Sequence, residues 1–555
     1  MGSLQPATIL RDIRSKQTLP QISMPGKYHA RTSHHKTRTG CRVCKIRRVK
    51  CDETKPACRR CTSTGRKCEG YPASTPSPAS RDSQSPPAKT PHLAVAAIHS
   101  LSVYHVSSDI PGDSAERRSF YYLRERAVYD ISGYFESEFW DRLVLQIGHT
   151  EPSVRHALLA LSSLCETYES QDLIGAQSRF NVHFALHHYN TAVRLVAEYL
   201  STSQPRLDVI LTSCLVFAWL EIMWNDFDTG LRHLKSGLKI LDDFRQLKKS
   251  PALRSQHVDV SLIYLFSRLK TQATVYRIQA SDFIPEGHQE IREAIPNSFS
   301  SIEQARNSLH TLSDTAFRFV RQLGNPNILE SMTSFDLPPD LLSLGATCRS
   351  CLNQFQNWQR SIENSPASIF QSLNPRQTAA MCLLQMYHKT LTIFLETLFT
   401  RSQMIYDQYD SSFGRIITLS EQLINRNSQS MSLIIFFDMG VMAPLLYVIL
   451  KCRNLALRRK ALSLLRLAPC REGMWYRQDV IEYAEWKIGI EERGRGKLSE
   501  AESLPEEARI WNEHKREVFI DGRQRVVVSF QRRSKDGIEY SEDITDLNIR
   551  MGQLI

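Results

Sequence analysis

The chain has 555 residues, of which 42% are hydrophobic, and a formal net charge of +12. This composition excludes a protein that is disordered throughout, because a chain of this length and apolar content can bury a sizeable core. The charge is concentrated at one end: residues 1–70 carry 17 Lys and Arg against 4 Asp and Glu, whereas residues 71–555 carry 53 against 54. This distribution predicts a basic module that binds a polyanion, joined to an electrically neutral body.

Residues 1–35 are expected to form a flexible basic arm. The first 25 of them lack the apolar stretch of a secretory signal. We therefore expect the protein to stay in a reducing compartment, where cysteines rarely pair as disulfides.

Residues 36–70 hold six of the chain's thirteen cysteines, arranged as one C-x2-C-x6-C unit written twice: Cys41, Cys44, Cys51, Cys58, Cys61 and Cys68. Repeated C-x2-C pairs in a reducing compartment are typical of metal ligands. Because structural zinc takes four ligands, six sulfurs can satisfy two ions only if two sulfurs are shared. The spacing therefore predicts a bridged pair of zinc ions. An alternative, in which His34 and His35 complete two separate sites, ignores the internal repeat.

The same segment is poor in apolar side chains, since only Val43, Ile46, Val49 and Ala57 are aliphatic between the first and last of these cysteines. Four small or medium side chains cannot build an ordinary core. We therefore expect the metal to supply the folding energy of the module.

Basic residues fill the gap between the second and third cysteines. The sequence KIRRVK at 45–50 predicts a short helix that opens just after Cys44, with Ile46 and Val49 facing the cluster. No acidic residue lies between Cys41 and Cys51. Such a face suits phosphates and the guanine acceptors of the major groove. The candidate DNA contacts are Arg42, Lys45, Arg47, Arg48, Lys50, Arg59 and Arg60.

Residues 41–68 resemble the fungal binuclear zinc cluster transcription factors, since both C-x2-C pairs, both six-residue gaps, the basic run and Pro56 fall in place. The resemblance implies that Cys41 and Cys58 bridge the two ions. The remaining cysteines would complete the two tetrahedra in pairs, Cys44 with Cys51 and Cys61 with Cys68.

The resemblance also implies the partner, which is double-stranded DNA containing CGG-like triplets. Arg48 and Arg47 would lie at the end of the first helix that reads the bases. In this family the loop at Pro56 often contains a cis peptide bond, an isomer that the sequence leaves open.

Residues 71–112 are rich in Pro and Ser and are expected to form a flexible linker. Related modules often place a dimerising coiled coil at this point. No sustained heptad pattern lies between residues 69 and 115, so a homodimer is left open.

Residues 113–545 are predicted to form a large all-α regulatory domain with a small C-terminal β-hairpin, which makes the fold class mainly α. Asp113 and Glu116 indicate a capping box before the first helix. The apolar stretches at 209–224 and 431–450 are expected to be buried helices rather than membrane spans, because charged residues, Gly and Pro interrupt them. Asp521 and Gly522 lie between two apolar runs and predict the hairpin turn.

The body resembles the fungal-specific regulatory domain that commonly follows this zinc cluster. The resemblance is carried by PSVRHALLALSSL at 152–164, LRHLKSGLKIL at 231–241, the helical run at 437–465 and REGMW at 471–475. It implies a regulatory region without an established catalytic role.

Two rival functions were weighed against DNA binding. An enzyme is disfavoured, because the histidines of HFALHHYN, His183, His187 and His188, lack the Glu of a zincin helix and a third ligand, and Cys348 with Cys351 is a lone pair without a second. A zinc-stabilised adaptor for RNA is disfavoured by the absence of aromatic residues between 41 and 68, although a protein partner stays open.

The sequence thus predicts a nuclear regulator of RNA polymerase II transcription that is not an enzyme and does not enter membranes. Its partners would be double-stranded DNA and the transcription machinery or co-regulators. The basic stretch at 36–50 could also serve as a nuclear import signal. A metabolic or secondary-metabolite gene set is common among relatives, but the residues select no target.

Overall fold

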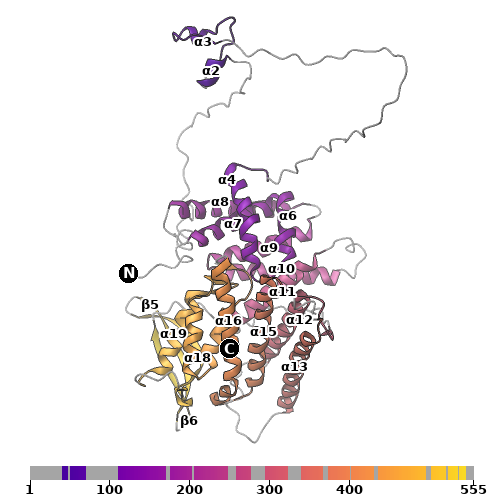
Figure 1. The fold of residues 1–555 in the computed structure, drawn as a ribbon, viewed down its shortest axis with the longest axis vertical. Coiled ribbons are helices and arrows are strands. Elements are labelled where there is room, and N and C mark those ends of the chain that lie inside the picture. The colour runs from indigo at the N-terminus through magenta and orange to yellow at the C-terminus, as the bar shows by residue number, and fades with distance from the viewer. Residues whose placement is uncertain are drawn as a thin grey trace, which may run out of the picture. The chain divides into compact units, whose positions relative to one another are not determined.

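The computed structural model divides the chain into two compact units, one formed by Leu19–Val106 and the other by Met1–Thr18 with Ser107–Ile555. Figure 1 draws the elements of each unit. The structure describes residues 41–47, 51–69, 110–170, 176–202, 205–247, 258–276, 294–322, 339–366, 373–400, 402–430, 435–495, 502–520, 523–534 and 537–545. The predicted arm and most of the predicted linker lie outside these ranges.

The smaller unit contains two short helices, α2 (Arg42–Ile46) and α3 (Arg59–Thr62). The buried residues in its described part are cysteines, against which the partly buried Val43 packs. A core made almost entirely of sulfur agrees with the expectation that apolar burial alone does not fold this segment.

The first half of the larger unit is helical, as predicted. Its α-helices are α4 (Ser114–Tyr122), α5 (Val128–Ser132), α6 (Val144–Thr150), α7 (Pro152–Ser170), α8 (Ala176–Leu200), α9 (Leu207–Met223), α10 (Phe227–Leu247) and α11 (Val260–Tyr276), with π-helical turns at Leu123–Ala127 and Phe139–Leu143. The predicted capping box is confirmed: the Asp113 side chain accepts the Glu116 N–H at 2.8 Å, and Glu116 accepts the Asp113 N–H at 2.7 Å.

The second half adds the helices α12 (Ile302–Gln322), α13 (Pro339–Glu363), α15 (Pro375–Thr397), α16 (Asp410–Ser430), α17 (Met442–Lys451), α18 (Leu455–Leu465) and α19 (Arg477–Glu492), with 3-10 turns at Gln403–Tyr409 and Glu506–Ala508. Apolar side chains from both halves form one continuous core. The stacked rings of Trp219 and Phe437, whose centroids lie 4.0 Å apart, join residues that are distant in sequence.

The apolar stretch at 209–224 is confirmed as a buried helix, since it forms most of α9. The expectation of a helix across 431–450 is wrong in its first part, because Ile435–Phe436 form strand β1 and α17 begins only at Met442. A Cβ atom at Gly440 would lie 2.5 Å from the Glu472 carboxylate and from the Phe436 ring, so a larger residue here would have to displace these two buried side chains. Among the described residues, every helix is too short or too polar to span a bilayer.

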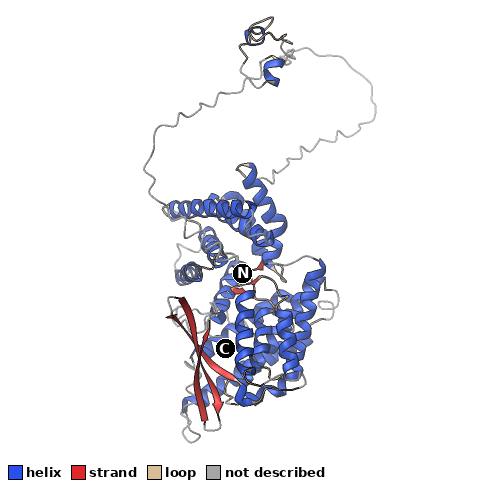
Figure 2. Ribbon diagram, turned by 90° about the vertical axis from the view of Figure 1, so that its left-hand side faces the viewer, coloured by secondary structure: helices blue, strands red, loops and turns tan. Residues whose placement is uncertain are grey.

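Two small sheets complete the larger unit. In the first, β1 pairs in parallel with β2 (Arg471–Glu472), which pairs antiparallel with β3 (Trp475–Tyr476). The second is antiparallel in the order β4 (Ile510–Ile520), β5 (Arg523–Ser534) and β6 (Gly537–Thr545), drawn in red in Figure 2. The predicted hairpin corresponds to β4 and β5, although its turn residues lie outside the described ranges. The third strand, β6, was not predicted from the sequence.

The terminal sheet is docked on α19 by aromatic and polar contacts. The rings of Trp486 and Phe530 meet edge to face, and the Trp486 indole N–H donates to Asp543 at 2.9 Å. Nearby, the buried Glu491 carboxylate pairs with Arg458 at 2.6 Å and Arg509 at 2.9 Å, linking α18, α19 and the segment that leads into β4. The terminal appendage is therefore part of the folded body.

Candidate metal centre and DNA-binding surface

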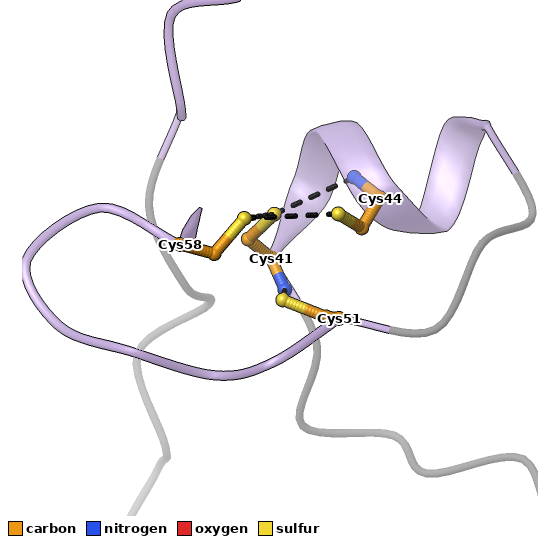
Figure 3. A group of neighbouring side chains, drawn as sticks. All are labelled: Cys41, Cys44, Cys51 and Cys58. Carbon is orange, nitrogen blue, oxygen red and sulfur yellow. Dashed lines mark hydrogen bonds between the residues drawn. The ribbon is translucent and has the colours of Figure 1, made fainter. Parts of the chain in front are cut away.

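The six predicted ligands come together in the smaller unit. Their sulfur atoms form two groups of four, Cys41, Cys44, Cys51 and Cys58 in one and Cys41, Cys58, Cys61 and Cys68 in the other, each within 4.8 Å. The first group is drawn in Figure 3: Cys41 directly precedes helix α2, Cys44 lies in it, Cys51 and Cys58 follow along the chain, and the four side chains converge. The two groups share Cys41 and Cys58, the pair that the resemblance assigns as bridges.

The distances between these sulfurs suit zinc. A tetrahedral ion with Zn–S bonds of about 2.3 Å separates two of its sulfurs by about 3.8 Å. Cys58 Sγ lies 3.5 Å from Cys41 Sγ and 3.7 Å from Cys44 Sγ, and Cys41 Sγ lies 3.8 Å from Cys61 Sγ. The thiol donor set and its spacing therefore fit two zinc ions that share two ligands.

Backbone amides hold the sulfurs in a pattern that repeats with the sequence. The Cys41 N–H donates to Cys51 Sγ at 3.4 Å, and the Cys58 N–H donates to Cys68 Sγ at 3.5 Å. Both bonds span ten residues and occupy matching places in the two C-x2-C-x6-C units. Hydrogen bonds of this kind, from backbone amides to metal-binding side chains, orient the Cys51 and Cys68 sulfurs. The internal symmetry of the sequence is thus also present in the structure.

The first helix begins earlier than predicted. It starts at Arg42 rather than after Cys44, because Cys41 Sγ accepts the Cys44 N–H at 3.4 Å and takes the place of an N-cap acceptor. Among the described aliphatic side chains, Val43 packs on the cysteines, and the predicted contacts of Ile46 and Val49 stay untested. The structure does not describe the Ile46 side chain, and Val49 lies outside the described residues.

Burial makes these thiols hard to ionise without a cation. Burial raises the pKa values of Cys44, Cys58 and Cys61 to about 12, with further contributions from neighbouring thiols. Cys51 differs, because N–H groups that donate to its sulfur outweigh burial and lower its pKa to about 7. A bound divalent cation stabilises thiolates, so metal binding would release protons from this cluster.

The loop between the half-motifs is ordered by Asp52. Its carboxylate accepts the Arg59 N–H at 2.9 Å and the Thr54 hydroxyl at 3.1 Å, which positions the start of α3. The peptide bond between Lys55 and Pro56 is cis, the isomer common in the resembled family.

The candidate DNA contacts are only partly described. Arg42, Arg59 and Arg60 are exposed at the starts of α2 and α3, and Arg47 is half-buried and donates to the Thr64 hydroxyl at 3.3 Å. Lys45 lies in α2, but its side chain is not described. Arg48 and Lys50 lie outside the described residues, so their roles stay predictions.

The lone pair of cysteines in the helical body, Cys348 and Cys351, lies in the protein core. Cys348 and Cys351 are both buried on α13, and the Cys348 thiol contacts the Leu395 carbonyl at 3.5 Å. Burial raises the pKa of both thiols, which suits protonated core cysteines rather than nucleophiles.

Comparison with known families identifies both parts of the chain. Residues 39–78 match the fungal Zn(2)-Cys(6) binuclear cluster domain, and residues 121–447 match the fungal specific transcription factor domain. The second match alone covers more than half of the chain.

Several curated proteins are similar to the chain. The aspercryptin biosynthesis cluster-specific transcription regulator atnN of Emericella nidulans is 26% identical over 407 residues, which cover 70% of this chain and 64% of that regulator. The transcription regulator lscL of Purpureocillium lilacinum is 23% identical over 410 residues, 70% of this chain and 96% of the relative. The transcriptional regulatory protein moc3 of Schizosaccharomyces pombe is 52% identical over 59 residues, 11% of this chain and 12% of moc3. No solved structure matches the chain.

Proposed function

The chain belongs to the family of fungal-specific transcription factors that carry a Zn(2)-Cys(6) binuclear cluster, and we propose that it regulates RNA polymerase II transcription by recognising CGG-like triplets in double-stranded DNA. The family and the similar regulators are not enzymes, and the cluster domain binds two zinc ions. The zinc ions supply folding energy; the base and phosphate contacts belong to the protein side chains.

The sulfur pair of Cys41 and Cys58 carries the proposal. Because two groups of four sulfurs share these residues, both ions would lie in one rigid centre between α2 and α3. Both helices begin beside a bridging cysteine, at Arg42 and Arg59, and present exposed arginines there. The metal centre would therefore fix the geometry of the basic surface.

The basic side chains would have two different roles in DNA recognition. Contacts to phosphates position a protein on the duplex, whereas contacts to base edges select the sequence. Arg47 and Arg48 are the candidates for base contact. The others would bind phosphates: Arg42, Lys45, Lys50, Arg59 and Arg60.

A mobility-shift comparison at physiological salt tests this function. The full chain should bind a duplex with CGG triplets on the order of 10³-fold or more tightly than a matched duplex in which the triplets are scrambled. Equal affinity for both duplexes would reject sequence-specific recognition and favour the alternative, an adaptor that binds protein or RNA.

The gene set is a narrower proposal. A regulator of the aspercryptin biosynthesis cluster is among the similar proteins, so we expect this chain to control genes of secondary metabolism. The helical body at 113–545 would regulate the zinc module at 36–70 through the linker at 71–112, in the nucleus and with co-regulators as partners. A homodimer stays open. Genome-wide mapping of binding sites would contradict this proposal if the bound promoters lacked biosynthetic genes.

A further inference from the structure

Three side chains that can bind metal meet in the helical body, far in sequence from the six cysteines of the zinc cluster. They are Glu116 on α4, His156 on α7 and His188 on α8, and their ligand atoms all lie within 4.8 Å of one another. We propose that these three residues form a second metal site, which binds one divalent transition-metal ion such as zinc. Two imidazoles and one carboxylate are a ligand set that zinc uses in proteins.

The two imidazoles are close to the spacing that one ion requires. The Nδ1 atoms of His156 and His188 face each other at 2.8 Å, and their rings are nearly parallel, at 16°. Two nitrogens bound to one tetrahedral zinc at about 2.0–2.1 Å lie about 3.3 Å apart. Metal entry therefore requires the two rings to separate by about half an ångström, which small side-chain rotations can provide.

The carboxylate is held in place by the end of a helix. Glu116 Oε2 accepts the Asp113 N–H at 2.7 Å in the capping box of α4. Its other oxygen, Oε1, lies 4.0 Å from His188 Nε2, which is the ring nitrogen that does not face His156, so the His188 ring must turn for one of its nitrogens to share an ion with both partners. An outer hydrogen bond that orients a ligand in this way is typical of metal sites.

Packing also restricts His188. Its side chain is 5% exposed, and the ring of Phe184 lies 4.2 Å from it, centroid to centroid. Burial lowers the pKa of His188 to about 4 and also lowers the pKa of His156, so both rings are neutral near pH 7. Neutral imidazole is the form that binds metal.

The alternative is a metal-free pair in which one neutral imidazole donates its Nδ1–H to the other. That arrangement explains the 2.8 Å contact but gives the adjacent carboxylate no role beyond the cap. A metal ion would use all three side chains and would join α4, the helix that follows the linker, to the pair formed by α7 and α8.

Metal counting on the full chain tests the proposal. The protein is stripped of metal, reloaded with excess Co²⁺, freed of loosely bound ion, and analysed for cobalt. We expect one equivalent beyond the two of the cysteine cluster. The variants His156→Gln and His188→Gln should each lose this equivalent. The matched control is His183→Gln, which changes an exposed histidine on α8, the helix of His188. This control should keep the additional equivalent of cobalt.

A second readout separates loss of the ion from loss of the fold. Added zinc should raise the melting temperature of the helical body in the wild type and the control, but not in His156→Gln, whose position is half-buried. Sulfur-to-cobalt charge-transfer absorption and DNA binding should be unchanged in all variants, because they report on the cysteine cluster. A wild type that binds only the two cluster ions, or a His156→Gln variant that retains the third, would overturn the proposal.

Discussion

Cys41 and Cys58 lie 17 positions apart in the chain, yet their sulfur atoms are 3.5 Å apart and belong to both groups of four cysteines. Each occupies the first position of its C-x2-C-x6-C unit. An ion bound in either group would contact both sulfurs, so removing one of them should damage both sites. Loss of both ions on removal of one cysteine would distinguish a shared centre from two independent zinc sites.

Loss of a bridging cysteine should abolish DNA binding without unfolding the body. If Cys58 bridges the ions as proposed, Cys58→Ser removes a ligand common to both, and the described residues of the module form no apolar core that could replace the metal. We expect loss of both zinc ions by metal analysis, loss of the mobility shift, and little change in helical circular dichroism. A chelator should have the same effect on the wild type. The control Cys214→Ser changes a half-buried cysteine of α9; a similar loss of zinc there would refute the assignment.

Two basic residues should affect DNA binding in different ways. Arg48→Ala should reduce discrimination between CGG and altered triplets by about 1–3 kcal/mol, because a bidentate contact to guanine is lost. Lys50→Ala should weaken binding evenly on all sequences and lower the salt dependence of the affinity by about one phosphate contact. Titrations against a panel of duplexes at several salt concentrations measure both effects. Equal losses on every duplex for both variants would contradict the division of roles.

The buried ion cluster at α19 should be important for stability. Glu491 is fully buried between Arg458 and Arg509, so Glu491→Ala leaves two buried guanidinium groups without their partner. We expect a loss of about 3–5 kcal/mol in the free energy of unfolding. The adjacent Glu492 pairs with the partly exposed Arg459 at 3.5 Å, so Glu492→Ala should cost less than about 1 kcal/mol. Urea unfolding measures the free energy of unfolding of both variants. Similar losses in the two would argue against a large stabilising contribution from the buried ion cluster.

Glu472 should make stability depend on pH near neutrality. Burial raises its pKa to about 7 from an ordinary 4.5, although backbone N–H groups, including that of Met442 at 2.7 Å, oppose this shift. Between about pH 4.5 and pH 7, the folded protein therefore retains a proton on Glu472 that the unfolded chain has lost. The resulting stability is complete below about pH 4.5 and declines as the pH rises toward 7.

The variant Glu472→Gln should remove this dependence. Between pH 5 and 8 it should gain about 1–3 kcal/mol in unfolding free energy relative to the wild type, since one pKa unit corresponds to about 1.4 kcal/mol. Glu198→Gln, at a side chain that is 58% exposed, is the control and should follow the wild type. Parallel pH profiles for Glu472→Gln and the wild type would show that this carboxylate does not titrate in that range.

Local signals in the sequence predicted much of the fold. The capping box at Asp113 and Glu116 and the ligand repeat are patterns within a few residues, and both correspond to contacts in the structure. The ligand roles of individual cysteines and the base contacts stay predictions, because they depend on the ions and on DNA.

Features set by distant partners were not predictable. Strand β6 carries only a short apolar alternation, at Ile538, Tyr540 and Ile544, which Glu542 interrupts, and none of its residues is buried, so its signal in the sequence is weak. The three-ligand cluster combines Glu116, His156 and His188, which lie 40 and 32 residues apart in the chain. The neighbours of His188 on its own helix supply no third ligand, since the other two residues of the cluster come from different helices.

Cadmium-113 NMR of residues 19–106 loaded with cadmium tests the shared metal centre most directly. If Cys41 and Cys58 bridge the ions, two resonances of equal intensity will appear in the range of four-thiolate sites, and they will be coupled to each other through the shared sulfurs. A single resonance, or two resonances without mutual coupling, would contradict a binuclear centre.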